Sequence, residues 1–164
     1  MGIDPSNFTR RHFIAVALAA PSAAAFGAAA ARTLRTVLFV CQYGTVKSAV
    51  AREVFRRRAA VRGIAVNVIS RGITPEAHMS PALAAHLAAD GIDPLRDTVQ
   101  PLDREALDRA DIVVIFDPLP QALVRSDARD WTAMPSLNAT YDAARAFLDQ
   151  RIESLLGELM RDAH

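Results

Sequence analysis

The chain has 164 residues, of which 51% are hydrophobic and 23% charged, and its formal net charge is +1. These values are typical of a globular domain and exclude a disordered or strongly cationic chain. One domain is expected at this length, and the near-zero net charge gives no reason to expect a nucleic acid or an anionic membrane surface as partner.

The N-terminal segment has the pattern of an export signal. Adjacent arginines at Arg10 and Arg11 precede a weakly hydrophobic, alanine-rich stretch that reaches Ala31, with small residues suitable for cleavage near its end. This order resembles a twin-arginine (Tat) signal, which delivers folded proteins across the membrane. We therefore expect residues 1–31 to be a cleaved signal that engages the Tat export machinery.

The alternative for this segment is an N-terminal membrane anchor, because its apolar stretch approaches the length of a membrane span. Pro21, Ser22 and the many alanines make it a poor span. We expect no stable span, a mature domain over residues 32–164, and a location in the periplasm or outside the cell.

After the signal the chain alternates between strand-like and helix-like patterns. Continuous apolar or β-branched runs predict strands over 36–41, 65–70 and 111–116, and a short fourth strand over 131–134. Helical spacing and capping residues predict helices over 47–60, 80–91 and 103–110, and a last helix that begins at Asn138 or Thr140. Because strands separated by helices need right-handed crossovers, we expect a parallel sheet with helices on both faces.

The only cysteine, Cys41, ends the first predicted strand and precedes a turn into a helix. An anion above it would be held by the backbone N–H groups of the loop and helix N-terminus, and the same field stabilises a thiolate. The candidate anion-binding residues are Gln42, Tyr43, Gly44, Thr45, Val46 and Lys47. A structural, buried cysteine is the alternative, since free cysteines are often buried.

The residues around the loop predict nucleophilic chemistry at phosphorus. Gly44 permits the positive φ that an anion-binding loop needs, and Lys47 adds a positive charge. The Cys41 thiolate would attack phosphorus and form a thiophosphate intermediate. Ser48 could donate a hydrogen bond to the sulfur and stabilise it as leaving group; an ordinary helix cap is the alternative role for Ser48.

From Thr36 to the last helix the chain resembles the low-molecular-weight protein tyrosine phosphatase and arsenate reductase superfamily. Besides the strand–cysteine–loop–helix unit, the resemblance is carried by Ser70-Arg71-Gly72, Gly91-Ile92-Asp93, Ala110-Asp111-Ile112-Val113-Val114 and the stretch from Trp131 to Pro135. It implies an α/β fold of the phosphotyrosine protein phosphatase I type: one three-layer domain with a four-stranded, mainly parallel sheet.

The active-site loop departs from the family pattern. The family places an adjacent arginine and serine a short loop after its cysteine, and here Lys47 stands at the arginine position before Ser48. A guanidinium grips two phosphate oxygens, whereas an ammonium is a point charge, so the change would cost roughly 2–4 kcal/mol of transition-state stabilisation. Gly44 replaces the usual loop asparagine, and Tyr43 replaces the glycine before it.

The family's general acid is an aspartate followed by proline, and here Met134 occupies that place before Pro135. Methionine cannot protonate a leaving group, and the loss of general acid catalysis costs about 10² or more in rate. Asp117, followed by a proline at the end of the third predicted strand, is a weak candidate for the acid, although it could instead cap the following turn. Asp130 is a more remote candidate.

The sequence thus predicts a phosphatase-like hydrolase of phosphate monoesters, with Cys41, Ser48 and Asp117 as the candidate catalytic residues. Its substrate would be a phosphate-bearing small molecule or a phosphopeptide. A non-catalytic oxyanion or phosphopeptide binder is the first alternative. An arsenate reductase is the second, which with a single cysteine would need an external thiol. No cofactor or metal is expected, because His78 and His86 lack metal-ligand spacing.

Overall fold

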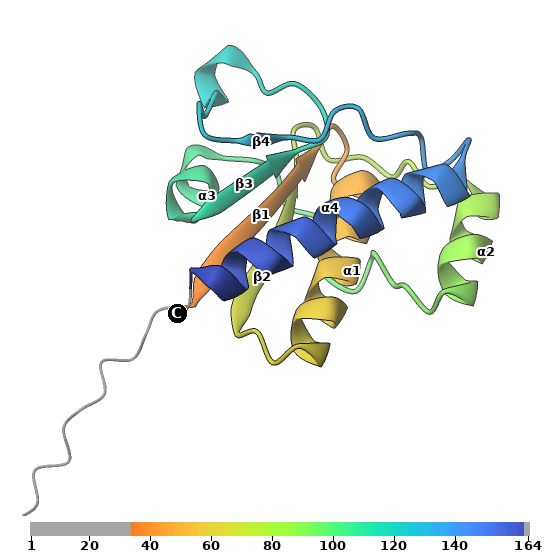
Figure 1. The fold of residues 1–164 in the computed structure, drawn as a ribbon. Coiled ribbons are helices and arrows are strands. Elements are labelled where there is room, and N and C mark those ends of the chain that lie inside the picture. The colour runs from red at the N-terminus through yellow and green to blue at the C-terminus, as the bar shows by residue number, and fades with distance from the viewer. Residues whose placement is uncertain (1–33, 163–164) are drawn as a thin grey trace, which may run out of the picture. The chain divides into compact units, whose positions relative to one another are not determined.

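The computed structural model describes residues 34–162, so the export signal predicted for residues 1–31 lies outside the described residues. Its sheet contains β1 (Arg35–Cys41), β2 (Val66–Gly72), β3 (Ile112–Ile115) and β4 (Arg129–Asp130). The strand order is β2-β1-β3-β4 and every neighbouring pair is parallel. The expected parallel sheet is confirmed, and the carboxyl ends of β1, β2 and β3 meet at one edge (Figure 1).

Helices cover both faces of this sheet, as the alternating pattern predicts. They are α1 (Lys47–Val61), α2 (Pro81–Ala89), α3 (Arg104–Arg109) and α4 (Tyr141–Arg161), with a short 3-10 helix at Gln121–Leu123. Because successive strand residues point to opposite faces, Val37, Phe39 and Cys41 pack in a core with α1, α2 and α4. Leu38 and Val40 pack on the other face with α3. The three-layer architecture is therefore confirmed.

The capping residues explain where two helices begin. Ser80 accepts a hydrogen bond from the N–H of Leu83 at 3.1 Å and starts α2. Asp103 accepts one from the N–H of Ala106 at 2.7 Å and starts α3. Each bond satisfies one of the N–H groups that a helix start leaves without an intrahelical partner. Gly91, with φ of 62°, follows α2 as the sequence predicts.

The helix α4 begins where the sequence predicts, but without the predicted capping hydrogen bond. Thr140 is the N-cap residue, but its side chain makes no capping hydrogen bond and instead donates to the carbonyl of Ser136 at 3.1 Å. Asn138 does not cap α4 either. Its side chain joins the segment before α2, where it accepts from the N–H of Ser80 and donates to the carbonyl of His78.

The fourth strand was predicted in the wrong place. The strand is the two-residue β4 at Arg129–Asp130, not 131–134. The N–H of Trp131 still donates to the carbonyl of Ile115, but the chain then turns, because the Asp130 carboxylate accepts from the N–H of Thr132 and the Trp131 carbonyl accepts from Met134. The apolar side chains of Trp131 and Met134 pack in the core, and these residues do not extend the strand.

An aromatic cluster supports the sheet below the end of β1. The Phe39 ring lies 5.7 Å from Phe55, 6.2 Å from Phe116 and 5.9 Å from Trp131, measured between ring centroids. All four rings are buried. Trp131 is therefore a core residue. Large buried rings contribute much of the stabilisation of such a core, so Cys41 follows a strand that is anchored in the core.

Tyr141, the first residue of α4, also packs against a neighbouring helix rather than a ligand. Its ring stacks on His86 of α2 at 4.8 Å, and its hydroxyl donates to the Asp90 carboxylate. Burial, followed by this hydrogen bond, raises the pKa of Tyr141 to about 12. The contact joins the start of α4 to the end of α2.

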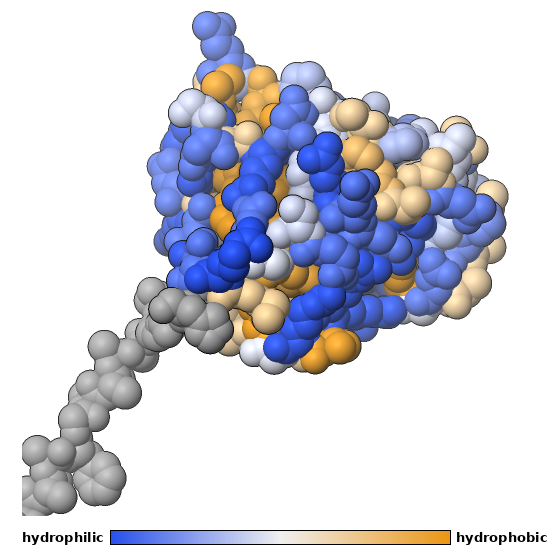
Figure 2. Space-filling model, in the orientation of Figure 1, coloured by the Kyte–Doolittle hydropathy of each residue, from blue (hydrophilic) through white to orange (hydrophobic). Residues whose placement is uncertain are grey.

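The surface crossed by α4 is largely hydrophilic (Figure 2). Beneath it, the basic run of α1 pairs with acids on other elements: Arg58 with Asp149 at 2.9 Å and with Glu153 at 2.7 Å, and Arg56 with Asp97 at 2.8 Å. These arginines therefore connect α1 to other elements of the fold. Within residues 34–162, no helix combines the length and apolarity needed to cross a membrane.

Two glycines allow the loop after β1 to touch the end of β2. Gly44 has φ of 74°, and a Cβ built on it would lie 2.7 Å from Val99 and 2.9 Å from the backbone nitrogen of Gly72. A Cβ on Gly72 would lie 2.9 Å from the backbone of Tyr43 and Gly44. The close approach thus requires glycine on both sides, and at Gly44 the positive φ requires it as well.

We predict that Gly44→Ala destabilises the protein by about 2–4 kcal/mol, since it combines a strained φ with steric overlap. Gly63→Ala is the matched control, because Gly63 has a similar φ of 66° but open space around its Cβ position. In Gly63→Ala, backbone strain alone should lower the unfolding free energy by about 1 kcal/mol. Urea unfolding of both variants measures the difference. Equal losses of unfolding free energy in the two variants would contradict the close approach.

Candidate active site

The loop between β1 and α1 is attached by its carbonyl groups to the chain that leaves β2. The carbonyl oxygens of residues 41–43 accept hydrogen bonds from N–H groups within residues 73–76, at 2.8 to 3.2 Å. The Thr45 hydroxyl donates to the carbonyl of Glu76 at 2.8 Å. The carbonyls of residues 41–43 are therefore directed toward the chain that leaves β2.

The Cys41 sulfur lies at the base of this loop in a polar setting. It accepts a hydrogen bond from the N–H of Gly44 at 3.2 Å, and the Ser48 hydroxyl lies 3.1 Å away. The same hydroxyl is 3.5 Å from the carbonyl of Arg71. Although Cys41 is only 3% exposed, it lines a pocket and is therefore reachable by a ligand. The sulfur thus has two polar neighbours, and the N–H of Gly44 donates a hydrogen bond to it.

Ser48 lies within α1 and is not its cap. The N-cap position belongs to Val46, and no described side chain makes a capping hydrogen bond to α1. The first turn of α1 also contains no acidic residue among those described. A helix start of this kind presents N–H groups and the positive end of the helix dipole to an anion.

Lys47 and Asp117 form an ion pair at the mouth of the loop. The Lys47 ammonium lies 3.1 Å from one Asp117 oxygen, and both side chains are about one quarter exposed. The other Asp117 oxygen accepts the N–H of Gln42 at 2.9 Å. Asp117 therefore lies in the site, where both of its oxygens accept hydrogen bonds, and it does not cap the turn that follows it.

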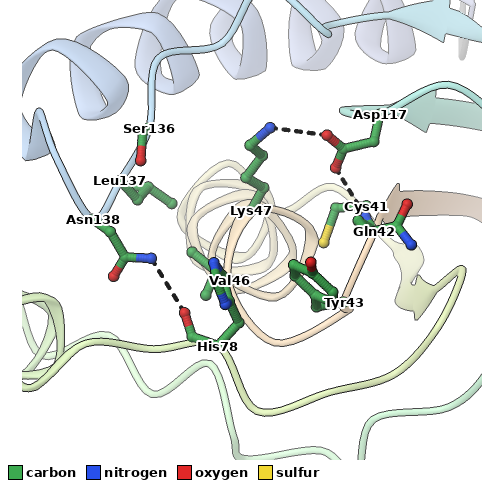
Figure 3. A pocket seen from close by; sticks show the side chains of 10 residues that line it. All are labelled: Cys41, Gln42, Tyr43, Val46, Lys47, His78, Asp117, Ser136, Leu137 and Asn138. Atoms are coloured by element: carbon green, nitrogen blue, oxygen red, sulfur yellow. Dashed lines mark hydrogen bonds and ion pairs between the residues drawn. The ribbon is translucent and has the colours of Figure 1, made fainter.

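These residues surround a pocket of about 160 Å³ (Figure 3). Of the residues predicted from the sequence, Cys41, Gln42, Tyr43, Val46, Lys47 and Asp117 line it. Gly44 and Thr45 of the loop and Ser48 of α1 are buried. The structure therefore brings all the predicted site residues to one place at the carboxyl edge of the sheet, where parallel α/β sheets bind ligands.

The opposite wall of the pocket was missed in the sequence analysis. It is formed by His78, from the segment before α2, and by residues 136–138, from the segment before α4. The His78 ring contacts Tyr43, with 4.6 Å between ring centroids. Asn138 joins the two segments by its hydrogen bonds to His78 and Ser80. In the sequence, the only signal of this wall was the polar Asn138, which was predicted only as a possible cap of the last helix.

Neither the residue at the family's acid position nor the remote candidate Asp130 lines this pocket. Met134, which occupies the family's acid position, is 5% exposed and packs in the core. Asp130 accepts a hydrogen bond from the N–H of Thr132, and hydrogen bonding to Thr132 lowers the pKa of its carboxyl group. A carboxyl group with a lowered pKa is a poor proton donor at neutral pH. Within residues 34–162, no cluster of His, Cys, Asp and Glu could hold a metal ion.

A sequence model of the low molecular weight phosphotyrosine protein phosphatases matches residues 36–133. The chain therefore belongs to this family. No curated protein matches the sequence.

Solved structures show the same fold. YfkJ from Bacillus subtilis is 18% identical, with a TM-score of 0.65 over 80% of this chain and 98% of that one. A thioredoxin-dependent arsenate reductase from Corynebacterium glutamicum is 20% identical, with a TM-score of 0.61 over 80% and 65%. The tyrosine phosphatase Wzb from Escherichia coli K30, in complex with sulphate, is 13% identical, with a TM-score of 0.58 over 77% and 99%.

The ion pair generates a prediction about anion affinity. Asp117 places a negative charge beside the position of a bound oxyanion, so Asp117→Asn should tighten the binding of inorganic phosphate about five- to tenfold. Asparagine keeps an oxygen that can accept from Lys47. Isothermal titration calorimetry with phosphate measures the change.

Asp111→Asn is the control for this charge change, because Asp111 accepts the N–H of Thr36 at the opposite end of β1, at 2.7 Å. It should leave phosphate affinity unchanged. Unchanged or weaker phosphate binding in Asp117→Asn would show that Asp117 does not compete with the ligand.

Proposed function

We propose that the protein is an exported phosphatase that hydrolyses phosphate monoesters of the phosphotyrosine type through a thiophosphate on Cys41. The observation that carries the proposal is the setting of the sulfur, which accepts the N–H of Gly44, lies 3.1 Å from the Ser48 hydroxyl and lines the pocket. Membership in a family of phosphatases supports the same reaction class.

In the first step, the Cys41 thiolate attacks phosphorus and the bond from phosphorus to the ester oxygen breaks, so that the leaving oxygen has to receive a proton. The free N–H groups at the start of α1, together with Lys47, stabilise the charge on the phosphoryl oxygens. In the second step, water attacks phosphorus and the sulfur departs as a thiolate. The Ser48 hydroxyl lies close enough to the sulfur to stabilise that departure.

Two features weaken this site relative to the family pattern. Lys47 offers one point charge where a guanidinium would bind two oxygens, and part of its charge is neutralised by Asp117. The family's acid position holds the buried Met134. These features also favour the second candidate function, a protein that binds an oxyanion or phosphopeptide without hydrolysing it.

Turnover of p-nitrophenyl phosphate separates the two functions, since its good leaving group needs little acid assistance. We predict slow hydrolysis that Cys41→Ser abolishes and that Lys47→Arg increases about tenfold or more, because arginine restores the bidentate contact. Lys47→Gln is the matched control and should lower the rate. Saturable phosphate binding without any turnover would instead support the binder, and an unchanged rate in Cys41→Ser would remove the thiol from the reaction.

Export is proposed on the sequence of the N-terminal segment. Changing both Arg10 and Arg11 to lysine preserves the charge but removes the paired arginines on which twin-arginine signals depend. We predict that this double variant accumulates in the cytoplasm while the wild type reaches the periplasm, as measured by cell fractionation and immunoblotting. Equal periplasmic amounts of the two would contradict a twin-arginine route.

A further inference from the structure

We propose that His78 is the catalytic residue that protonates the leaving oxygen and then accepts a proton from the attacking water. The inference rests on the proposed phosphatase function. It answers a chemical need, because departure of an alcohol from a phosphate monoester is slow without a proton donor. Met134 is buried and apolar, and both oxygens of Asp117 already accept hydrogen bonds.

The position of His78 suits this role. It belongs to the segment between β2 and α2 and lines the same pocket as Cys41 and Lys47. Figure 3 shows its ring on the inner side of the pocket wall, next to Tyr43. A donor to the ester oxygen has to lie across the pocket from the nucleophile, since the leaving oxygen departs on the side away from the sulfur.

The His78 ring is held in place but its nitrogens are free. The backbone carbonyl of His78 accepts a hydrogen bond from Asn138 at 3.2 Å, and the ring contacts Tyr43 at 4.6 Å between centroids. Within residues 34–162, no hydrogen bond engages either ring nitrogen. His78 is also exposed at the rim, so solvent can return a proton to it between turnovers.

The ionisable groups that share the pocket leave histidine as the suitable donor. Cys41 ends β1, Tyr43 lies in the loop, Lys47 begins α1 and Asp117 follows β3, whereas residues 136–138 carry no charge. Cys41 is the nucleophile, and Lys47 and Asp117 are paired with each other. Imidazole both donates and accepts a proton near neutral pH, as the two steps require.

The protons balance over the cycle. In the first step the sulfur–phosphorus bond forms, the phosphorus–oxygen bond breaks, and the His78 proton passes to the departing oxygen. In the second step the neutral imidazole takes a proton from water as the water oxygen bonds to phosphorus. The sulfur–phosphorus bond then breaks, which regenerates the thiolate, the protonated histidine and inorganic phosphate.

Two substrates that differ in leaving group test the role of His78. Phenyl phosphate has a poor leaving group and p-nitrophenyl phosphate a good one, so only the first depends strongly on a donor. We predict that His78→Phe, which keeps a ring against Tyr43, lowers kcat/KM for phenyl phosphate about 100-fold. For p-nitrophenyl phosphate it should lower kcat/KM less than about fivefold.

His86→Phe is the matched control, because His86 also stacks on a tyrosine, at 4.8 Å, but does not line the pocket. His86→Phe should leave kcat/KM unchanged for both substrates. Equal losses of kcat/KM for both substrates in His78→Phe would show that His78 has a packing role. An unchanged kcat/KM for phenyl phosphate would show that another group donates the proton. Either result overturns the proposal. Absence of Cys41-dependent hydrolysis of either substrate by the wild type would overturn the proposed function together with it.

Discussion

The loop that holds Cys41 is fixed by backbone hydrogen bonds to the chain leaving β2, and the rest of the site depends on this attachment. The carbonyls of residues 41–43 are used by N–H groups within residues 73–76, and Gly44 rests against Gly72. The backbone hydrogen bonds need no particular side chain, whereas the close approach needs glycine at both positions. The loop can therefore keep its shape while its other residues differ from the family pattern. The sulfur and the start of α1 consequently face the same small pocket.

The charges around that pocket define how this chain differs from the family pattern. Lys47 supplies a cation, but Asp117 neutralises part of it and also takes the N–H of Gln42. The site therefore has groups that can bind an anion, but the Asp117 carboxylate already contacts two of them. Under the proposed function, a phosphate ester would have to displace or tolerate this carboxylate, and the proposal therefore predicts weak binding and slow turnover.

The sequence predicted the features that depend on neighbouring residues. These features are the apolar run before Cys41, the glycine at position 44 and the cap at Ser80, each of which depends on residues only a few positions away. The fourth strand was placed wrongly because the apolar Trp131 resembles a strand residue, whereas its side chain serves the core and Asp130 turns the chain. The wall formed by His78 and Asn138 depends on residues 60 positions apart, which no local pattern reveals.

The central claim is that Cys41 bonds covalently to phosphorus during turnover. Acid quenching of the protein during hydrolysis of p-nitrophenyl phosphate, followed by mass spectrometry of the peptide that contains Cys41, tests it directly. The account predicts that this peptide gains the mass of one phosphoryl group, and that the adduct disappears once substrate is exhausted. Continued hydrolysis with a phosphoryl group found elsewhere, or with Cys41 unmodified throughout, would contradict it.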